Sequence, residues 1–471
     1  MTLEHATAAR RAEAPAPAGN AARLDAGLAI ARTSSGLTCI ALPVPVCSAA
    51  AAVAAGDARL AWSARGLAIV GIGIARELRG RGDARWRDVI TGARSIAERG
   101  VRVVGDDDPS AHALCRPRLL GGLAFASGAA DRAPWAAFGD AWFALPRWTY
   151  ASDGTTARLL LVCDGLDAGE PARWSAELAT LERAFAMRFA PRALPTIQAI
   201  DHGDRAAFCA EVAAITRAIE SGECAKIVAA RSAIVELASA ARPGDLLSAL
   251  DARATADGVR LLVRPSTSED ALIAATPERL VARHGDAVQC DALAGTIARS
   301  AIAPEVTLLA SDKDRREHAL VVDAITRALA GAGAEVDAPG EPRLRELRDV
   351  LHLHTPISAR LRTPRHVLEL AEALHPTPAV GGTPTHTAVE WIAAHEPARG
   401  WYASPVGWFD LDGDGELAVA IRCGVFAGSR AQLWAGGGIV AGSDPERELA
   451  ETEVKLRALI GAFGPVGERT A

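Results

Sequence analysis

Short apolar runs broken by glycine and proline recur through the first 190 residues of this chain. Residues 67–74, 119–125 and 159–162 are examples. Runs of this length between turn-forming residues are typical of strands joined by hairpins. One helix is expected near residues 174–188, and the absence of a repeat of 20–50 residues argues against a solenoid or a propeller. The prediction for this part is a strand-rich, antiparallel fold.

Beyond the prolines at 191 and 195, the chain mixes helices with strands. The expected helices are 204–220, 312–329 and a last one that begins at 443 or 444; the expected strands are 225–235, 259–263, 271–275 and hairpins within 401–440. Because strands and helices do not alternate regularly, the predicted class is α+β. Residues 1–20 are interpreted as a disordered leader and residues 21–466 as one large domain.

Composition excludes several classes of function. The net charge of −6 provides no basic surface for nucleic acid. The longest apolar stretch, residues 48–56, is much too short to span a bilayer. No two of the eight cysteines form a CxxC pair, so reduced thiols are the simpler interpretation. We expect a cytoplasmic protein that acts on a small molecule and has no nucleic-acid or membrane partner.

Lysine is scarce in this chain. Of its 51 basic residues only three are lysines, Lys226, Lys313 and Lys455. Arginine cannot replace lysine where a deprotonable amine is needed, so a lysine in this arginine-rich background suggests a catalytic role. For Lys313 and Lys455, survival by chance explains the sequence equally well. For Lys226, the surrounding motif favours a functional role.

Acidic residues occur at helix positions in the second half. Glu448 and Glu451 are three residues apart on the last predicted helix, with Lys455 four residues further, and Glu317 lies near the start of the predicted helix 312–329. A solvated charged face is the alternative explanation for each of them. Carboxylates that converge from two helices would suit Mg²⁺, which binds one or two carboxylates and completes its shell with water and substrate oxygens.

Six ordered motifs bring these residues together. They are Lys226-Ile-Val-Ala-Ala-Arg-Ser, Ala275-Thr-Pro-Glu-Arg-Leu, Asp291-Ala-Leu-Ala-Gly-Thr, Ser311-Asp-Lys-Asp-Arg-Arg-Glu-His, His375-Pro-Thr-Pro-Ala-Val-Gly-Gly and the run from Gly438 to Thr452. Together they resemble the isochorismate synthases, which belong to the chorismate-utilising enzymes with the anthranilate, aminodeoxychorismate and salicylate synthases. The resemblance is strong over residues 195–465 and weaker upstream. It implies large antiparallel sheets packed as a sandwich, helices on the outside, and a monomer.

The resemblance also implies roles. Lys226 matches the general base that activates water, and Glu278 matches the general acid. Glu317 and Glu451 match direct Mg²⁺ ligands, with Glu448 supporting them through water. The positions that match substrate-binding residues are Gly295 and Thr296 in a loop beside the ring, His352 next to the ring, Tyr402 and Arg422 at the enolpyruvyl carboxylate, and the backbone amides of Gly436 and Gly438.

The implied reaction is Mg²⁺-dependent conversion of chorismate to isochorismate, in which water adds at C2 and the C4 hydroxyl leaves. Its product would enter menaquinone, siderophore or salicylate synthesis. Ala294 stands where aminodeoxychorismate enzymes carry a nucleophilic lysine, which favours water as the attacking group. One alternative is a salicylate synthase, which also eliminates pyruvate. Another is a non-catalytic chorismate-binding or regulatory homologue, because Ser404, Gly437 and Cys423 depart from the usual pattern.

Overall fold

The computed structural model describes residues 19–105, 108–252, 258–337, 340–347 and 350–464. Residues 1–18 of the predicted leader, and residues 465–466 of the predicted domain, lie outside the described residues. Asn20 corrects the leader boundary, because it begins helix α1 (Asn20–Ala31). Its side-chain amide donates hydrogen bonds to the Pro43 carbonyl and the Glu182 carboxylate, at 2.8 and 2.6 Å. These contacts attach the start of α1 to the domain.

The strands branch from the long antiparallel pair β3 (Leu67–Gly80) and β6 (Ala141–Ser152). The first branch runs from β3 through β2 (Ala58–Ala64), β10 (Val259–Val263), β11 (Ala271–Thr276), β20 (Cys423–Ala427) and β21 (Arg430–Ile439) to β9 (Lys226–Leu237). The second runs from β6 through β5 (Arg118–Leu123), β18 (Pro405–Asp410), β19 (Gly415–Val419), β12 (Arg279–His284) and β13 (Ala287–Ala298) to β16 (Val350–Leu361).

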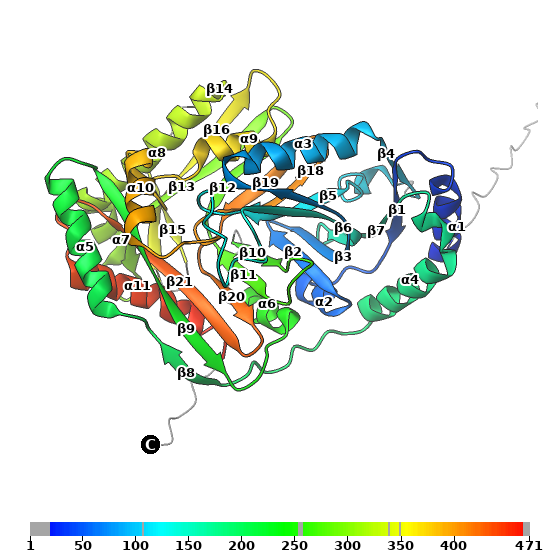
Figure 1. The fold of residues 1–471 in the computed structure, drawn as a ribbon, viewed down its shortest axis with the longest axis horizontal. Coiled ribbons are helices and arrows are strands. Elements are labelled where there is room, and N and C mark those ends of the chain that lie inside the picture. Colours follow the sequence, from blue (N-terminus) through cyan, green and yellow to red (C-terminus); the bar gives the residue numbers. More distant parts are fainter. Residues whose placement is uncertain (1–18, 106–107, 253–257, 338–339, 348–349, 465–471) are drawn as a thin grey trace, which may run out of the picture.

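Shorter strands extend these branches at their edges. They are β1 (Leu37–Pro43), β4 (Val101–Val104), β7 (Ala157–Cys163), β8 (Ile197–Asp201), β14 (Ala334–Val336), β15 (Arg343–Glu346) and β17 (Gly382–Thr383). Among the described strand pairs, only β1 and β4 are parallel. Helices lie around the strands (Figure 1), namely α2 (Ala49–Ala54), α3 (Arg85–Glu98), α4 (Pro171–Ala186), α5 (Arg205–Glu220), α6 (Pro243–Asp251), α7 (Pro304–Ala310), α8 (Asp312–Gly331), α9 (Val367–Leu374), α10 (Thr385–His395) and α11 (Pro445–Ile460). The predicted α+β class, with antiparallel sheets and outer helices, is confirmed.

Two of the links by which the chain passes between the branches lie next to each other. One is the short link from β11 to β12, which contains Glu278, and the other is the link from β19 to β20, which contains Arg422. The amide of Val419 donates to the Glu278 carbonyl at 3.0 Å, and the amide of Ala275 donates to the Arg422 carbonyl at 3.1 Å. These bonds hold a carboxyl group and a guanidinium group at the junction of the branches.

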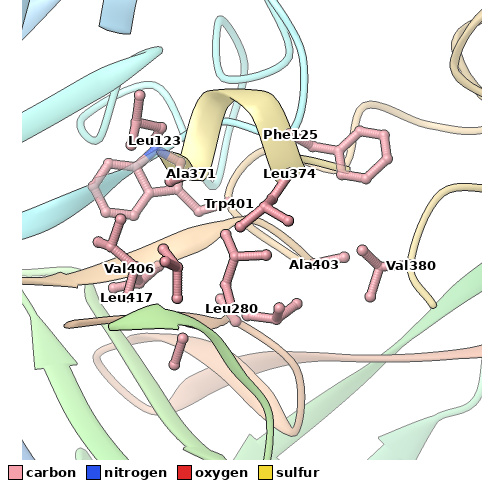
Figure 2. Packing of buried hydrophobic residues seen from close by; sticks show 14 of the residues in the cluster. Leu123, Phe125, Leu280, Ala371, Leu374, Val380, Trp401, Ala403, Val406 and Leu417 are labelled. Carbon is pink, nitrogen blue, oxygen red and sulfur yellow. The ribbon is translucent and has the colours of Figure 1, made fainter. Parts of the chain in front are cut away.

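One apolar core packs behind this junction. Leu280 of β12 and Leu417 of β19 belong to the same buried cluster as Ala371 and Leu374 of α9 and the indole of Trp401 (Figure 2). The Trp401 indole is fully buried, and its Nε1 donates to the Gly139 carbonyl at 2.8 Å. Burial of one such large side chain contributes about 2 to 3 kcal/mol, so this cluster fixes the segment that follows Trp401.

Most predicted elements of the second half are confirmed, whereas the first half holds more helix than predicted. Helix α11 begins at Pro445 with Asp444 as its cap, and β10 spans the predicted residues. Helices α1, α2 and α3 lie within the part predicted as strands and hairpins. The apolar stretch 48–56 largely forms the six-residue helix α2. Among the described residues, no helix has the length and apolar character needed to cross a membrane.

Candidate active site

A cavity of about 220 Å³ opens at the junction of the two branches. Its wall contains eleven of the twelve predicted site residues, namely Glu278, Gly295, Thr296, Glu317, His352, Tyr402, Arg422, Gly436, Gly438, Glu448 and Glu451. The twelfth, Lys226, contacts the wall through Glu317. The structure thus brings together residues that come from nearly half of the chain, although their chemical roles stay predictions.

Lys226 is the first residue of β9 and is fully buried. Its Nζ donates to Oε1 of Glu317, from α8, at 2.7 Å. Gly438 of β21 leaves room for this pair, because a Cβ at that position would lie 2.8 Å from Cε of Lys226 and 2.5 Å from Oε1 of Glu317. A side chain at 438 would therefore displace the lysine or the carboxylate.

Glu278 is a buried carboxyl group that keeps its proton near neutral pH. Burial, followed by the negative charge of Asp291, raises its pKa to about 8, although Lys226 and Arg345 act in the opposite direction. Burial alone would also raise the pKa of Asp291, but His354 holds that pKa below its ordinary value, with further help from Arg345. A charged Asp291 beside a protonated Glu278 is a suitable arrangement for a proton donor.

Each of the three lysines pairs with one of the predicted metal-binding carboxylates. Besides the pair of Lys226 with Glu317, Nζ of Lys313 lies 3.2 Å from Oε1 of Glu448. Nζ of Lys455 lies 2.6 Å from Oε1 of Glu451 and also donates to the Gly436 carbonyl at 2.7 Å. Lys313 and Lys455 both line the cavity, so chance survival is no longer needed to explain them. Their scarcity in the sequence was the signal that pointed to them.

The carboxylates have the donor chemistry that Mg²⁺ prefers. Glu448 is buried and accepts a hydrogen bond from Ser443 at 2.8 Å. Burial and the charge of Glu451 raise the pKa of Glu448, and a cation between the two carboxylates would relieve that repulsion. In the arrangement described here, no three acidic, histidine or cysteine side chains among the described residues converge closely enough to hold a metal ion. The carboxylate side chains are therefore of the type that binds Mg²⁺, and their ion pairs with the three lysines would have to break for them to do so.

His352 of β16 lies opposite a bulge in β13. The register of β13 against β16 shifts at Gly295, whose φ of +77° glycine adopts without strain. The prediction of a loop at Gly295 and Thr296 is therefore wrong, because these residues form part of a bulged strand. Nδ1 of His352 lies 2.9 Å from Oγ1 of Thr296 and 3.3 Å from the Gly295 carbonyl.

Burial, with the nearby charge of Arg422, places the pKa of His352 well below its ordinary value, so the ring is neutral. A neutral ring that donates from Nδ1 to the Gly295 carbonyl leaves Nε2 as an acceptor. Nη2 of Arg422 is 3.4 Å from that Nε2. His352 therefore orients the guanidinium of Arg422 without adding positive charge to the cavity.

Tyr402 contributes a phenol group to the cavity wall. Its ring stacks on Trp434 with centroids 6.3 Å apart, and Trp434 in turn packs against Trp135 at 4.8 Å. Burial raises the pKa of Tyr402, so its hydroxyl stays protonated and can donate a hydrogen bond. A Cβ at Gly436 would lie 2.9 Å from this hydroxyl, which explains the absence of a side chain there. Trp434 was not predicted, since no motif contains it.

The cavity thus combines a protonated carboxyl group with a set of acidic side chains, and a buried lysine lies behind one of them. The chain belongs to the family described as chorismate-binding enzymes, which matches residues 30–464. This family assignment confirms the resemblance seen in the motifs.

Individual relatives agree with the family. The chain is 35% identical over 424 residues to a "Salicylate biosynthesis isochorismate synthase" of Pseudomonas aeruginosa, a match that covers 87% of this chain and 85% of the relative. It is 44% identical over 203 residues to "Isochorismate synthase MenF" of Bacillus subtilis, covering 42% of this chain and 43% of that protein. Among solved structures, "MenF, the Menaquinone-Specific Isochorismate Synthase" of Escherichia coli matches with a TM-score of 0.74 and 25% identity, over 94% of this chain and all of that one.

Proposed function

We propose that this protein is an isochorismate synthase that requires Mg²⁺ and converts chorismate to isochorismate. The observation that carries the proposal is a cavity wall that contains a protonated buried acid, Glu278, and a carboxylate, Glu317, bonded to the buried Lys226. The relatives named above support it, because they are called isochorismate synthases. Their names connect the product with menaquinone in one case and with salicylate in another.

Two ends of the cavity would hold the two carboxylates of chorismate. Arg422 can bind one of them with two parallel hydrogen bonds, assisted by the Tyr402 hydroxyl. At the other end, Glu317 and Glu451 would bind Mg²⁺, with Glu448 in support. When bound, the cation neutralises the second carboxylate of the substrate and fixes its orientation.

The proton transfers fall to Lys226 and Glu278. Lys226 takes a proton from the water molecule that forms the new bond at C2, and Glu278 gives a proton to the C4 hydroxyl, which leaves as water while the double bond shifts. One water is added and one is lost, so the reaction is an isomerisation. Lys226 can act as a base only as the neutral amine.

The three departures from the usual family pattern fit into this site. Ser404 is fully buried and donates to the Gly400 carbonyl at 3.4 Å, and Cys423 donates to the Ala420 carbonyl at 3.2 Å. A Cβ at Gly437 would approach Oε2 of Glu448 to 3.2 Å, so glycine gives this carboxylate more room. No feature of these residues favours a non-catalytic homologue over an enzyme.

Product analysis tests the proposal. Purified protein is incubated with chorismate, with and without MgCl₂, and the products are separated by chromatography. Isochorismate that appears only with Mg²⁺ is the expected result. Salicylate together with pyruvate would identify the lyase-coupled alternative, and unchanged chorismate would contradict catalysis.

A further inference from the structure

Arg399 lies outside the cavity, but its side chain contacts two segments of the cavity wall, and its own segment forms a third part of that wall. The side chain is buried, and its Nη2 donates to the Val228 carbonyl at 2.6 Å while Nη1 donates to the Val380 carbonyl at 2.8 Å. Its own carbonyl accepts the amide of Tyr402 at 3.0 Å. Val228, Val380 and Tyr402 all line the cavity. A single arginine thus joins β9, the turn that contains Val380 and the segment that carries Tyr402.

Glu396 holds this guanidinium in a fixed orientation. Its two oxygens accept from Nε and Nη2 of Arg399 at 2.7 and 2.6 Å, and each side chain is only 2% exposed. Such a two-point contact between a planar guanidinium and a carboxylate leaves little freedom of rotation. The Glu396 carboxylate also accepts the amide of Ala230 at 3.2 Å. The pair therefore forms hydrogen bonds with β9 at two places, the Val228 carbonyl and the Ala230 amide.

These hydrogen bonds are made to β9, the strand that carries the proposed base Lys226. Val228 and Ala230 follow Lys226 by two and four residues on β9. The turn that contains Val380 also bonds to this strand directly, because the Gly381 carbonyl accepts the Val228 amide at 2.9 Å. We propose that Arg399 and Glu396 form a positioning pair that fixes the position of β9, with Lys226, relative to the segment that carries Tyr402. The catalytic part of this inference rests on the proposed function. Neither side chain of the pair lines the cavity.

Arginine is required here because of its shape. A lysine ammonium is a single point of donors on a flexible chain, and it cannot reach two carbonyls and both oxygens of a carboxylate at once. Arg399→Lys therefore keeps the charge that Glu396 needs but releases at least one segment of the wall. A misplacement of about 1 Å can lower a rate about a hundredfold.

The test compares Arg399→Lys and Glu396→Gln with Arg118→Lys. Arg118 is a suitable control because it is also buried and donates to backbone carbonyls, those of Leu114 and Arg116 among them, yet it does not line the cavity. We expect Arg399→Lys and Glu396→Gln each to lower kcat at least about tenfold, and the double variant to be no worse than the poorer single variant, because both act through one contact. Arg118→Lys is expected to lower Tm while leaving kcat within about twofold of the parent. A purely structural role predicts equal effects on kcat in all three variants at equal loss of Tm, which would overturn the inference.

A measurement without substrate separates this inference from the proposed function. Hydrogen exchange of the ligand-free proteins is followed in peptides that cover residues 225–231, 377–383 and 399–404. All three peptides should exchange faster in Arg399→Lys than in Arg118→Lys, and Glu396→Gln serves as the second variant if Arg399→Lys does not fold. Unchanged exchange in these peptides overturns the positioning role. A parent protein that makes no isochorismate contradicts the proposed function, and the exchange data still decide whether the pair joins the three segments.

Discussion

The rate should fall above pH 8, because Glu278 donates a proton only in its protonated form. With the pKa raised to about 8, about nine-tenths of the molecules carry this proton at pH 7 and about one-tenth at pH 9, so kcat/KM should fall about tenfold between these values. A carboxyl group with an ordinary pKa would be protonated in fewer than about 1% of molecules at pH 7. Burial of Glu278 thus determines whether the acid works at neutral pH.

The assay is kcat/KM for chorismate at saturating Mg²⁺, measured from about pH 6 to about pH 9.5 at constant ionic strength. Glu278→Gln removes the donor and should lower kcat by roughly 10² to 10⁴ at pH 7. Asp291→Asn removes the negative charge that, after burial, does most to raise the pKa of Glu278, so the decline in kcat/KM should move to lower pH. A rate that stays constant between about pH 7 and about pH 9.5, or a decline that moves to higher pH in Asp291→Asn, would refute the reasoning.

Three further variants test the other proposed roles. Lys226→Arg keeps the positive charge but removes the deprotonable amine, so kcat should fall at least about a hundredfold while circular dichroism shows a folded protein; normal turnover would place the base elsewhere. Glu451→Gln should abolish the stimulation of activity by Mg²⁺ without loss of the fold, as followed in an Mg²⁺ titration; an unchanged titration would remove Glu451 from the metal site. Tyr402→Phe should raise KM for chorismate more than it lowers kcat, because the hydroxyl is proposed to bind a carboxylate; a selective loss of kcat would contradict that role.

The composition of the cavity wall could be predicted from the sequence, but its internal contacts could not. Lys226 and Glu278 belong to short local motifs, which can be recognised in the sequence without knowledge of the fold. The contact between Lys226 and Glu317 joins residues 91 positions apart, and that between Lys313 and Glu448 joins residues 135 apart. Contacts of this kind depend on how the two sheet branches meet, which no spacing in the sequence specifies.

Two other features of the structure, helix α3 and the bulge at Gly295, differ from the sequence predictions. In α3, the buried residues Trp86, Val89, Ile90 and Ala93 follow the i, i+3, i+4, i+7 spacing of an amphipathic helix, so this helix could have been predicted from the sequence. At Gly295, an Ala-Gly-Thr sequence is typical of a turn, whereas pairing with β16 on both sides keeps it within a strand as a bulge. In α3 the local pattern agrees with the structure, whereas at Gly295 tertiary packing overrides the local pattern.

The addition of water at C2 is the central claim, and isotope labelling measures it directly. The reaction is run in H₂¹⁸O with chorismate and Mg²⁺, and the isochorismate is isolated and examined by mass spectrometry. The proposed mechanism predicts one ¹⁸O atom in the product, located on the C2 hydroxyl. Isochorismate without the label would contradict water as the attacking group.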